Sequence, residues 1–200
     1  MKVAKGKWGH MNADKKKRIA ITAFLFFVPL LIFFTGWIYF KTRMTVWTVI
    51  AVVGCLPACK SMVSLILLIP QKSIPESEYL EIKEHAKNLT IAYELFVTGY
   101  EKNTYLDAVA VCGNTIAAYS SQDKTDAAFA ENHIQKIIRG NGFKVTVKIF
   151  KNKSQFLERL DSLYDHQDSL QEGIKFTPDS TYPELSRNEY IKHLILAISL

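Results

Sequence analysis

Two long apolar runs near the N-terminus constrain this chain more than any other feature of its sequence. Residues 19–40 hold no charged side chain over 22 positions, and residues 46–69 hold one, Lys60. A helix of about 20 apolar residues can cross the hydrocarbon core of a bilayer, which is about 30 Å thick. A helix buried in a soluble protein is rarely apolar on every face over such a length. The sequence therefore predicts a transmembrane hairpin over residues 19–70, with helices at 19–40 and 46–69.

A cleaved signal peptide is the alternative explanation for the first run. The apolar core of such a signal is usually about 7–15 residues long and is followed by a cleavage site of small residues. Here the run is longer, lacks such a site, and is followed directly by a second run. We therefore favour a membrane anchor.

The charges are divided unevenly along the chain. Residues 1–70 contain ten Lys or Arg and one acidic residue, whereas residues 71–200 contain fifteen Lys or Arg and eighteen Asp or Glu. Seven basic residues precede the first run, and only Lys41 and Arg43 lie between the two runs. Basic residues beside a span favour the cytoplasmic side. We therefore predict a basic cytosolic tail at 1–18, an outer loop, and a C-terminal cytosolic domain on a bacterial-type plasma membrane.

The second apolar run has features of a helix interface. Gly54, Ala58 and Ser61 are small residues that allow another helix to approach closely. Lys60 places a charge inside the span, at a cost of about 2.5–3.5 kcal/mol at a helix centre. A partner helix or a lipid phosphate would offset this cost, and a tilt or a water defect is the alternative. These four residues predict an interface with the bilayer and with a protein partner or a second copy.

Residues 71–200 are expected to form one cytosolic α/β domain in the order α-β-β-β-α-β-α-α, because 130 residues suffice for one core. The expected helices cover residues 76–88, 126–139, 154–166 and 187 onward, and the expected strands cover 93–101, 105–113, 115–122 and 143–150. Capping boxes are predicted at Ser73–Glu76 and Ser186–Glu189. Residues 167–185 are expected to be a polar loop. The three cysteines form no disulfide framework.

The segment YLDAVAVCGNTIAAYSSQDK contains a possible metal site. Asp107 lies on the second expected strand, and Gln122 and Lys124 form a Gln-x-Lys pattern after the third. With the element order, this pattern resembles the core of the restriction-endonuclease-like superfamily, in its Mrr and NERD-type branch, over residues 75–160. The resemblance implies that Asp107 and Gln122 hold Mg²⁺ or Mn²⁺, and that Lys124 stabilises the attacking water or the scissile phosphate.

The chain departs from the pattern of that superfamily at several points. Gln122 lies further from the Gly-Asn turn than expected, and Ser120 and Ser121, which are poor metal ligands, stand at the expected depth. Glu84 and Glu94 lie outside any motif. The excess of acidic residues in this part of the chain also argues against nucleic acid as a partner, because phosphate contacts dominate such binding. These departures predict a degenerate member of the fold.

Three functions are consistent with these features. The favoured one is a small integral membrane protein that anchors a non-catalytic α/β interaction or regulatory domain, without a cofactor. The first alternative is a metal-dependent nuclease or phosphodiesterase that uses Asp107, Gln122 and Lys124. The second alternative is a subunit of a membrane complex assembled through the second span.

Overall fold

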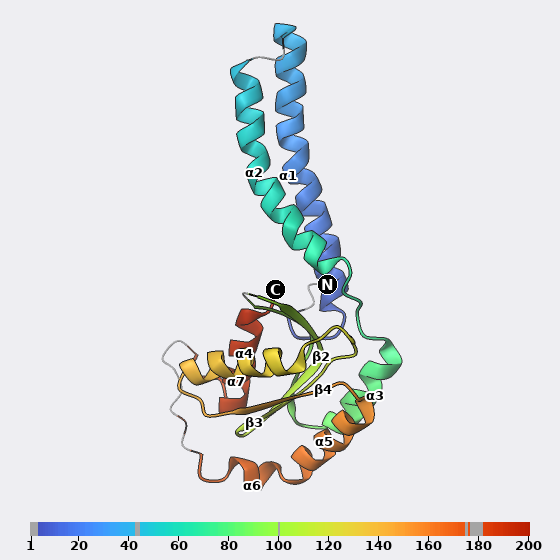
Figure 1. Ribbon diagram of the computed structural model, residues 1–200, viewed down its shortest axis with the longest axis vertical. Coiled ribbons are helices and arrows are strands. Elements are labelled where there is room, and N and C mark those ends of the chain that lie inside the picture. The colour runs from blue at the N-terminus through green and yellow to red at the C-terminus, as the bar shows by residue number, and fades with distance from the viewer. Residues whose placement is uncertain (1–3, 43–44, 100, 175, 177–181) are drawn as a thin grey trace. The chain divides into compact units, whose positions relative to one another are not determined.

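The computed structural model of the chain describes residues 4–42, 45–99, 101–174, 176 and 182–200. Its helices are α1 (His10–Phe40), α2 (Val46–Leu68), α3 (Glu76–Ala86), α4 (Ala127–Gly140), α5 (Lys153–Asp165), α6 (Gln167–Gln171) and α7 (Arg187–Ile198). Its strands are β1 (Thr90–Thr98), β2 (Asn103–Cys112), β3 (Thr115–Tyr119) and β4 (Thr146–Phe150). The chain divides into two compact units (Figure 1). Residues 11–72 form the hairpin unit, and the N-terminal segment up to His10 joins residues 73–200 in the α/β unit.

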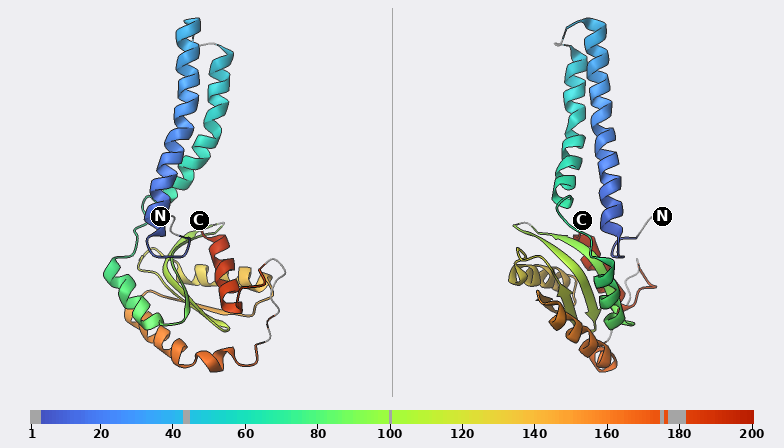
Figure 2. Two further views of the ribbon diagram at one scale, coloured as in Figure 1. Left: turned by 180° about the vertical axis from the view of Figure 1, so that it is seen from behind. Right: turned by 90° about the vertical axis from the view of Figure 1, so that its right-hand side faces the viewer.

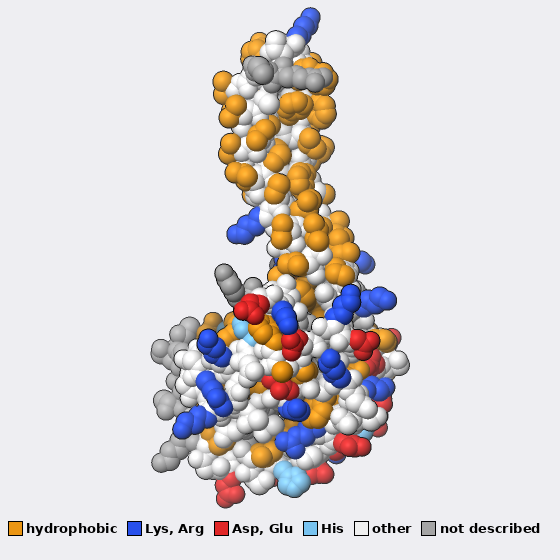
Figure 3. Space-filling model, in the orientation of Figure 1, with side chains coloured by type: hydrophobic (Ala, Val, Ile, Leu, Met, Phe, Trp, Pro, Cys, Tyr) orange, Lys and Arg blue, Asp and Glu red, His pale blue; other side chains and the backbone are white. Residues whose placement is uncertain are grey.

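The hairpin unit consists of two helices that are long and apolar enough to cross a membrane. In the most apolar 18-residue stretch of each helix, 17% is buried in α1 and 11% in α2. A core helix of a soluble protein would be mostly buried. Figure 3 shows apolar side chains covering the visible face of these helices, while charged side chains are scattered over the α/β unit. The helix predicted from residue 19 begins earlier, at His10, because the residues before the apolar run include Ala13, three lysines and Arg18, which are good helix formers.

The α/β unit is built on one mixed sheet of four strands in the order β1-β2-β3-β4. The first three strands form an antiparallel meander, and β4 runs parallel to β3. A parallel neighbour requires a crossover, and α4 supplies it between β3 and β4. The chain turns from β2 to β3 at Gly113 and Asn114, as the Gly-Asn pair predicts.

Helices cover both faces of this sheet (Figure 2). On one face, α4 packs on β4 and α7 packs on β1 and β2; on the other, α5 packs on β3 and β4 and lies beside α3. We call these the α4/α7 face and the α3/α5 face. The apolar core of the α4/α7 face includes Leu106, Val109, Ile116, Ile134 and Ile191. The core of the α3/α5 face includes Ile82, Ala108, Tyr119, Phe156 and Leu160.

The fold is mixed α/β as predicted, with local differences. The capping box predicted at Ser73–Glu76 is wrong, because Pro75 is the residue before α3 and the Ser73 hydroxyl donates a hydrogen bond to Glu94. The box at Ser186–Glu189 is confirmed at the start of α7. The expected polar loop contains α6. Residues 175 and 177–181 of that loop lie outside the described residues.

The outer edge of β1 is covered by both ends of the chain. The backbone N–H of Tyr93 donates to the carbonyl of Gly6 at 2.9 Å, and the N–H of Leu200 donates to the carbonyl of Phe96 at 2.9 Å. Val97 also pairs with Ser199 in an isolated bridge. An uncovered edge strand invites pairing with other chains. Part of the segment expected as a basic tail therefore lies against the sheet.

Candidate functional site

Two buried acidic residues occupy facing positions on the neighbouring strands β1 and β2. Tyr93 pairs with Ala108 and Leu95 pairs with Leu106, so Glu94 and Asp107 lie opposite each other between these pairs. Glu94 has a positive φ of 56°, which is uncommon for a residue other than glycine. This conformation interrupts the alternation of side chains along β1.

The interrupted alternation turns the Glu94 carboxylate toward the α3/α5 face. Tyr93 belongs to the core of that face, and Leu95 to the core of the opposite face. Glu94 lies between them, and its carboxylate accepts a hydrogen bond from the N–H of Ile74, another core residue of the α3/α5 face. Two successive residues, Tyr93 and Glu94, therefore point to the same side of the sheet.

Glu94 joins β1 to both segments that flank the hairpin unit. Its carboxylate is fully buried and accepts hydrogen bonds from the Ser73 hydroxyl and, at 3.2 Å, from the N–H of Ile74. His10 Nδ1 lies 3.7 Å from the other carboxylate oxygen and 2.9 Å from the carbonyl of Lys7. A buried carboxylate needs such partners to offset its desolvation. Glu94 thus holds together the segment before α1 and the segment after α2.

Asp107 is held by the loop that follows β3. It is 3% exposed, and its Oδ2 accepts a hydrogen bond of 2.5 Å from the N–H of Ser121. Burial raises the pKa of Asp107 above its ordinary value, the nearby Glu78 carboxylate raises it further, and the hydrogen bonds from Ser121 act in the opposite direction. Asp107 is therefore an acid whose proton is bound more tightly than in an exposed residue.

Two tyrosines complete this cluster on the α3/α5 face. The Tyr105 hydroxyl is buried and has no hydrogen-bond partner in the part of the chain that the structure describes. Burial raises its pKa, and the carboxylates of Asp107, Glu94 and Glu78 add to the effect. Burial likewise raises the pKa of Tyr119, which also interacts with Glu78 through a hydrogen bond. Both phenols therefore remain protonated donors at neutral pH.

This acid–tyrosine cluster can share protons and can bind a small polar group. A buried hydroxyl without a partner costs about 1–3 kcal/mol, so a ligand or water that accepts from Tyr105 would be bound favourably there. Among the residues that the structure describes, no three His, Cys, Asp or Glu side chains gather as metal ligands would.

The three residues of the expected nuclease motif lie in different environments. Asp107 is buried on β2, Gln122 is half-buried beyond the end of β3, and Lys124 is exposed in a turn. The third strand was predicted to reach Gln122 but ends at Tyr119. The carbonyl of Gln122 accepts a hydrogen bond from the N–H of Thr125. The segment thus connects β3 to α4.

Hydrogen bonds within this connection explain its polar sequence. The Ser120 hydroxyl donates to the carbonyl of Tyr105 at 2.7 Å and lies 2.8 Å from the hydroxyl of Thr125. Asp126 caps α4 by accepting a hydrogen bond from the N–H of Phe129. The segment SSQDKTD therefore has a structural role as a helix cap.

The small residues of α2 pack within the hairpin unit itself. A Cβ added at Gly54 would lie 3.3 Å from Pro29 of α1, Ala58 is fully buried, and the Ser61 hydroxyl lies 2.7 Å from that of Thr22 in α1. Lys60, by contrast, is exposed. The predicted interface residues thus face α1, except for the charged one.

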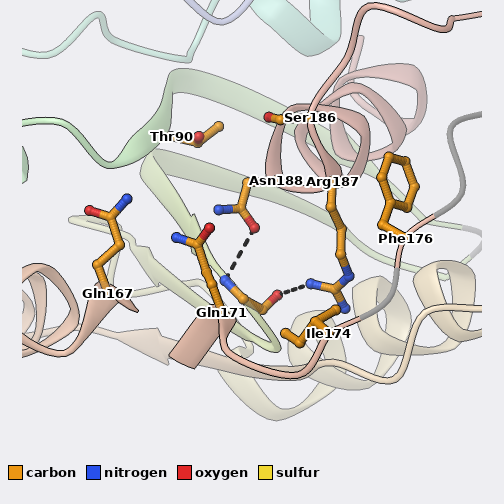
Figure 4. A pocket seen from close by; sticks show the side chains of 9 residues that line it. Thr90, Gln167, Gln171, Ile174, Phe176, Ser186, Arg187 and Asn188 are labelled. Atoms are coloured by element: carbon orange, nitrogen blue, oxygen red, sulfur yellow. Dashed lines mark hydrogen bonds between the residues drawn. The ribbon is translucent and has the colours of Figure 1, made fainter. Parts of the chain in front are cut away.

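A cavity of about 230 Å³ lies at the other end of the sheet, between the β2–β3 turn and the start of α7 (Figure 4). Arg187 donates to the carbonyl of Gly113 and, at 2.6 Å, to Oδ1 of Asn114, while Asn188 Oδ1 accepts from the N–H of Gly113 at 3.1 Å. Gly113 has φ of 55°, and a Cβ there would lie 2.2 Å from the carbonyl oxygen of Leu170. These groups are occupied in fixing the turn.

The sequence indicated only part of the acid–tyrosine cluster. Asp107 was identified through the resemblance to the restriction-endonuclease-like pattern, whereas Glu78, Tyr105 and the buried state of Glu94 were missed. A weak signal existed, because the acidic Glu94 interrupts an otherwise apolar strand. No protein-family model matches the chain, and neither does any curated protein or solved structure with which it was compared.

Proposed function

We propose that this protein is a small integral membrane protein whose two-helix hairpin anchors a non-catalytic α/β interaction or regulatory domain on the cytoplasmic side of a bacterial-type plasma membrane. The observation that carries the proposal is the exposure of apolar side chains along two helices long enough to span a bilayer. Phe24, Phe27 and Ile38 of α1 and Val49 and Leu56 of α2 are among them. In water this surface would be strongly unfavourable, and in lipid it is the expected one.

Contacts between the start of α1 and the residues after α2 support the proposal that both ends of the hairpin lie on the same side of the membrane. The ammonium of Lys15, near the start of α1, donates to the carbonyls of Ile69 and Gln71 after α2. The segments before α1 and after α2 both belong to the α/β unit. Because the basic residues cluster at this end, we assign it to the cytoplasm.

The structural role of the β3–α4 connection supports a non-catalytic domain. Ser120, Thr125 and Asp126 are engaged in hydrogen bonds that close the strand and cap α4. Lys124 lies exposed within the same connection. Gln122 and Lys124 thus belong to a connection whose neighbouring residues serve the fold, as expected of a degenerate member of that superfamily.

Labelling of single cysteines tests the anchor and its orientation. In a chain with its three native cysteines replaced by serine, Thr42→Cys lies in the predicted outer loop and Gln155→Cys on the exposed side of α5. A membrane-impermeant maleimide should label Thr42→Cys in intact cells and Gln155→Cys only after permeabilisation. Extraction of the protein by alkaline carbonate would contradict the anchor, and the reverse labelling pattern would contradict the orientation.

A metal-dependent nuclease or phosphodiesterase is the alternative, and the proximity of Asp107 and Glu78 favours it. The test is the electron-spin resonance signal of free Mn²⁺ titrated with the full chain in detergent. Site-specific loss of that signal, abolished by Asp107→Asn, would support the alternative. An unchanged signal at millimolar Mn²⁺ would leave the non-catalytic domain as the better proposal.

Assembly through α2 is a further alternative, and the exposed Lys60 is the observation that favours it. In this alternative Lys60 contacts a partner helix or a lipid phosphate. Lys60→Leu should then abolish a cross-linked oligomer or complex while leaving membrane insertion intact. Equal cross-linking of both forms would remove support for this interface.

A further inference from the structure

A basic pocket with an aromatic wall lies within the α/β unit. Its volume is about 450 Å³, and its lining comes from the N-terminal segment, α3, β1 and α7. The residues on which the argument depends are Lys5, Lys7, Trp8, Tyr79, Tyr93 and Lys192. Among the described residues that line this pocket, none is acidic. Three lysines from distant parts of the sequence therefore surround one cavity.

The N-terminal segment is held in place at several points. The carbonyl of Gly6 accepts from the N–H of Tyr93, and the Lys5 ammonium donates to the carbonyl of Ser199. Gly6 has φ of 82°, and a Cβ there would lie 2.9 Å from Leu196. Only glycine fits this backbone conformation without strain. The backbone between Lys5 and Lys7 is thus fixed against β1 and α7.

The aromatic wall is a continuous series of ring contacts. Trp8 stacks on Tyr79 with a centroid distance of 4.9 Å, and Tyr79 meets Tyr93 edge-on at 5.0 Å. The indole N–H of Trp8 donates to the carbonyl of Ile74 at 2.9 Å, which fixes the orientation of the ring. Trp and Tyr are the residues enriched at the head-group level of membranes.

The charge of the pocket favours an anion. The one acid on α7 is Glu189, three residues before Lys192; hydrogen bonds from Ser186 lower its pKa, and the charge of Lys192 adds a smaller effect in the same direction. The Glu189 carboxylate is already engaged in the capping box, where it accepts hydrogen bonds from the N–H and the hydroxyl of Ser186. Lys5 and Lys7 of the N-terminal segment add their positive charges to that of Lys192 around the cavity.

We propose that this pocket binds the phosphate group of an anionic phospholipid, with Lys5, Lys7 and Lys192 around the phosphate and the aromatic wall beside the glycerol. The lipid source rests on the proposed membrane anchor, because Trp8 lies two residues before His10, where α1 begins. Trp8 of the pocket is thus close in sequence to the helix that would enter the membrane. A soluble phosphate would supply the same chemistry.

Native mass spectrometry of the full chain, released from detergent with added phosphatidylglycerol or phosphatidylcholine, tests the lipid source. Basic residues near a membrane surface each contribute about 1 kcal/mol to the binding of anionic lipid. The triple variant Lys5→Gln, Lys7→Gln, Lys192→Gln should therefore lose phosphatidylglycerol affinity by about a hundredfold. The matched control replaces the exposed Lys136, Lys144 and Lys148, which do not line this pocket, and should bind as the parent does.

Inorganic phosphate, followed by broadening of its phosphorus-31 resonance in lipid-free detergent, tests the soluble source. Loss of phosphate binding by the variant at Lys5, Lys7 and Lys192, but not by the control variant, would support the pocket with a soluble ligand. Equal binding of both ligands by the two triple variants, or binding of neither ligand by the parent chain, would overturn the proposal. Lys192→Gln alone and thermal unfolding of each variant separate lost binding from misfolding.

Carbonate extraction of the same variants separates this proposal from the proposed function. A pocket variant that loses lipid binding but stays in the membrane supports both. A parent chain that binds phosphate yet is extracted by carbonate refutes the anchor and supports the pocket.

Discussion

The two faces of one four-stranded sheet differ in what they bury. The α4/α7 face is covered by an apolar core with residues such as Val109, Ile134 and Ile191. The α3/α5 face buries apolar residues too, but it also holds the carboxylates of Glu94 and Asp107 together with Tyr105. The same strands supply both faces. Apolar packing dominates the first face, where Gln135 also donates to the carbonyl of Val145 and Glu131 accepts from the N–H of Ile149, whereas the second face buries charged groups.

The difference arises from one backbone irregularity and its consequences. At Glu94 the positive φ turns a charged side chain into the α3/α5 face, where Ser73, Ile74 and His10 surround its carboxylate. His10 begins α1 and Ser73 follows α2, so Glu94 contacts both segments that flank the hairpin. The two sides of the sheet thus differ in polarity, and four comparisons of variants test this difference.

The largest effect is expected from the apolar face. Ile134 of α4 is fully buried, and Ile134→Ala should lower the free energy of unfolding by about 2–5 kcal/mol, because it leaves a cavity in a close-packed core. The measurement is hydrogen exchange of β2 amides in the full chain in detergent. Ile137→Ala, at a half-buried position on the same helix, should cost less. Equal costs at the two positions would mean that this face is not packed as described.

The next effect comes from the buried carboxylate that distinguishes the second face. Glu94→Ala would leave the Ser73 hydroxyl and the N–H of Ile74 without their acceptor, at a cost of about 1–3 kcal/mol. Faster proteolysis of the segment around His10 should accompany it. Glu84→Ala, at an exposed position on α3, is the matched control and should change stability by less than about 0.5 kcal/mol. Indistinguishable variants would refute the role of Glu94.

The third effect is a change in pH dependence at Asp107. Because its pKa is raised in the folded chain, the contribution of Asp107 to stability is greatest below its ordinary pKa and declines as the pH rises through the raised value. Asp107→Asn should remove this decline. The melting temperature of the variant minus that of the parent should therefore increase as the pH is raised from about 3.5 to neutrality. This range begins near the ordinary Asp pKa of about 3.9. Parallel melting curves across this range would show that Asp107 titrates normally.

The smallest effect separates the two tyrosines of the cluster. Tyr105→Phe removes a buried hydroxyl without a partner among the described residues, so it should be neutral or stabilising by up to about 1 kcal/mol. Tyr119→Phe removes a hydroxyl that hydrogen-bonds with Glu78 and should destabilise by about 1 kcal/mol. Thermal unfolding of the full chain measures both. A clear loss of stability in Tyr105→Phe would reveal a partner for that hydroxyl, such as a bound water or ligand.

Several elements could be predicted because their signals are local. The apolar run at 46–69 matches α2, the period of Ile134 and Ile138 matches α4, and the Ser186–Glu189 box matches the start of α7. Each depends on residues within a few turns of one helix. Composition, periodicity and capping act over that distance, so the sequence reports them directly.

The candidate site could be predicted only in part, for the opposite reason. The resemblance to a known metal-site pattern identified Asp107, but its carboxylate accepts a hydrogen bond from the N–H of Ser121, which that pattern does not include. The predicted cap residue Ser73 bonds instead to Glu94, 21 residues away. The partner of a buried polar group depends on which strands and loops meet in space, and no local pattern encodes that.

By itself the sequence determined two helices apolar enough to span a bilayer and the mixed α/β character of the rest. Hydrophobicity and periodicity are properties of the chain before it folds. Only the tertiary structure decided that Gly6 pairs with Tyr93, that Glu94 turns inward, and that Lys5 and Lys192 share one pocket. These contacts join residues up to 187 positions apart, so they exist only once the sheet has formed and its edge has bound the N-terminal segment.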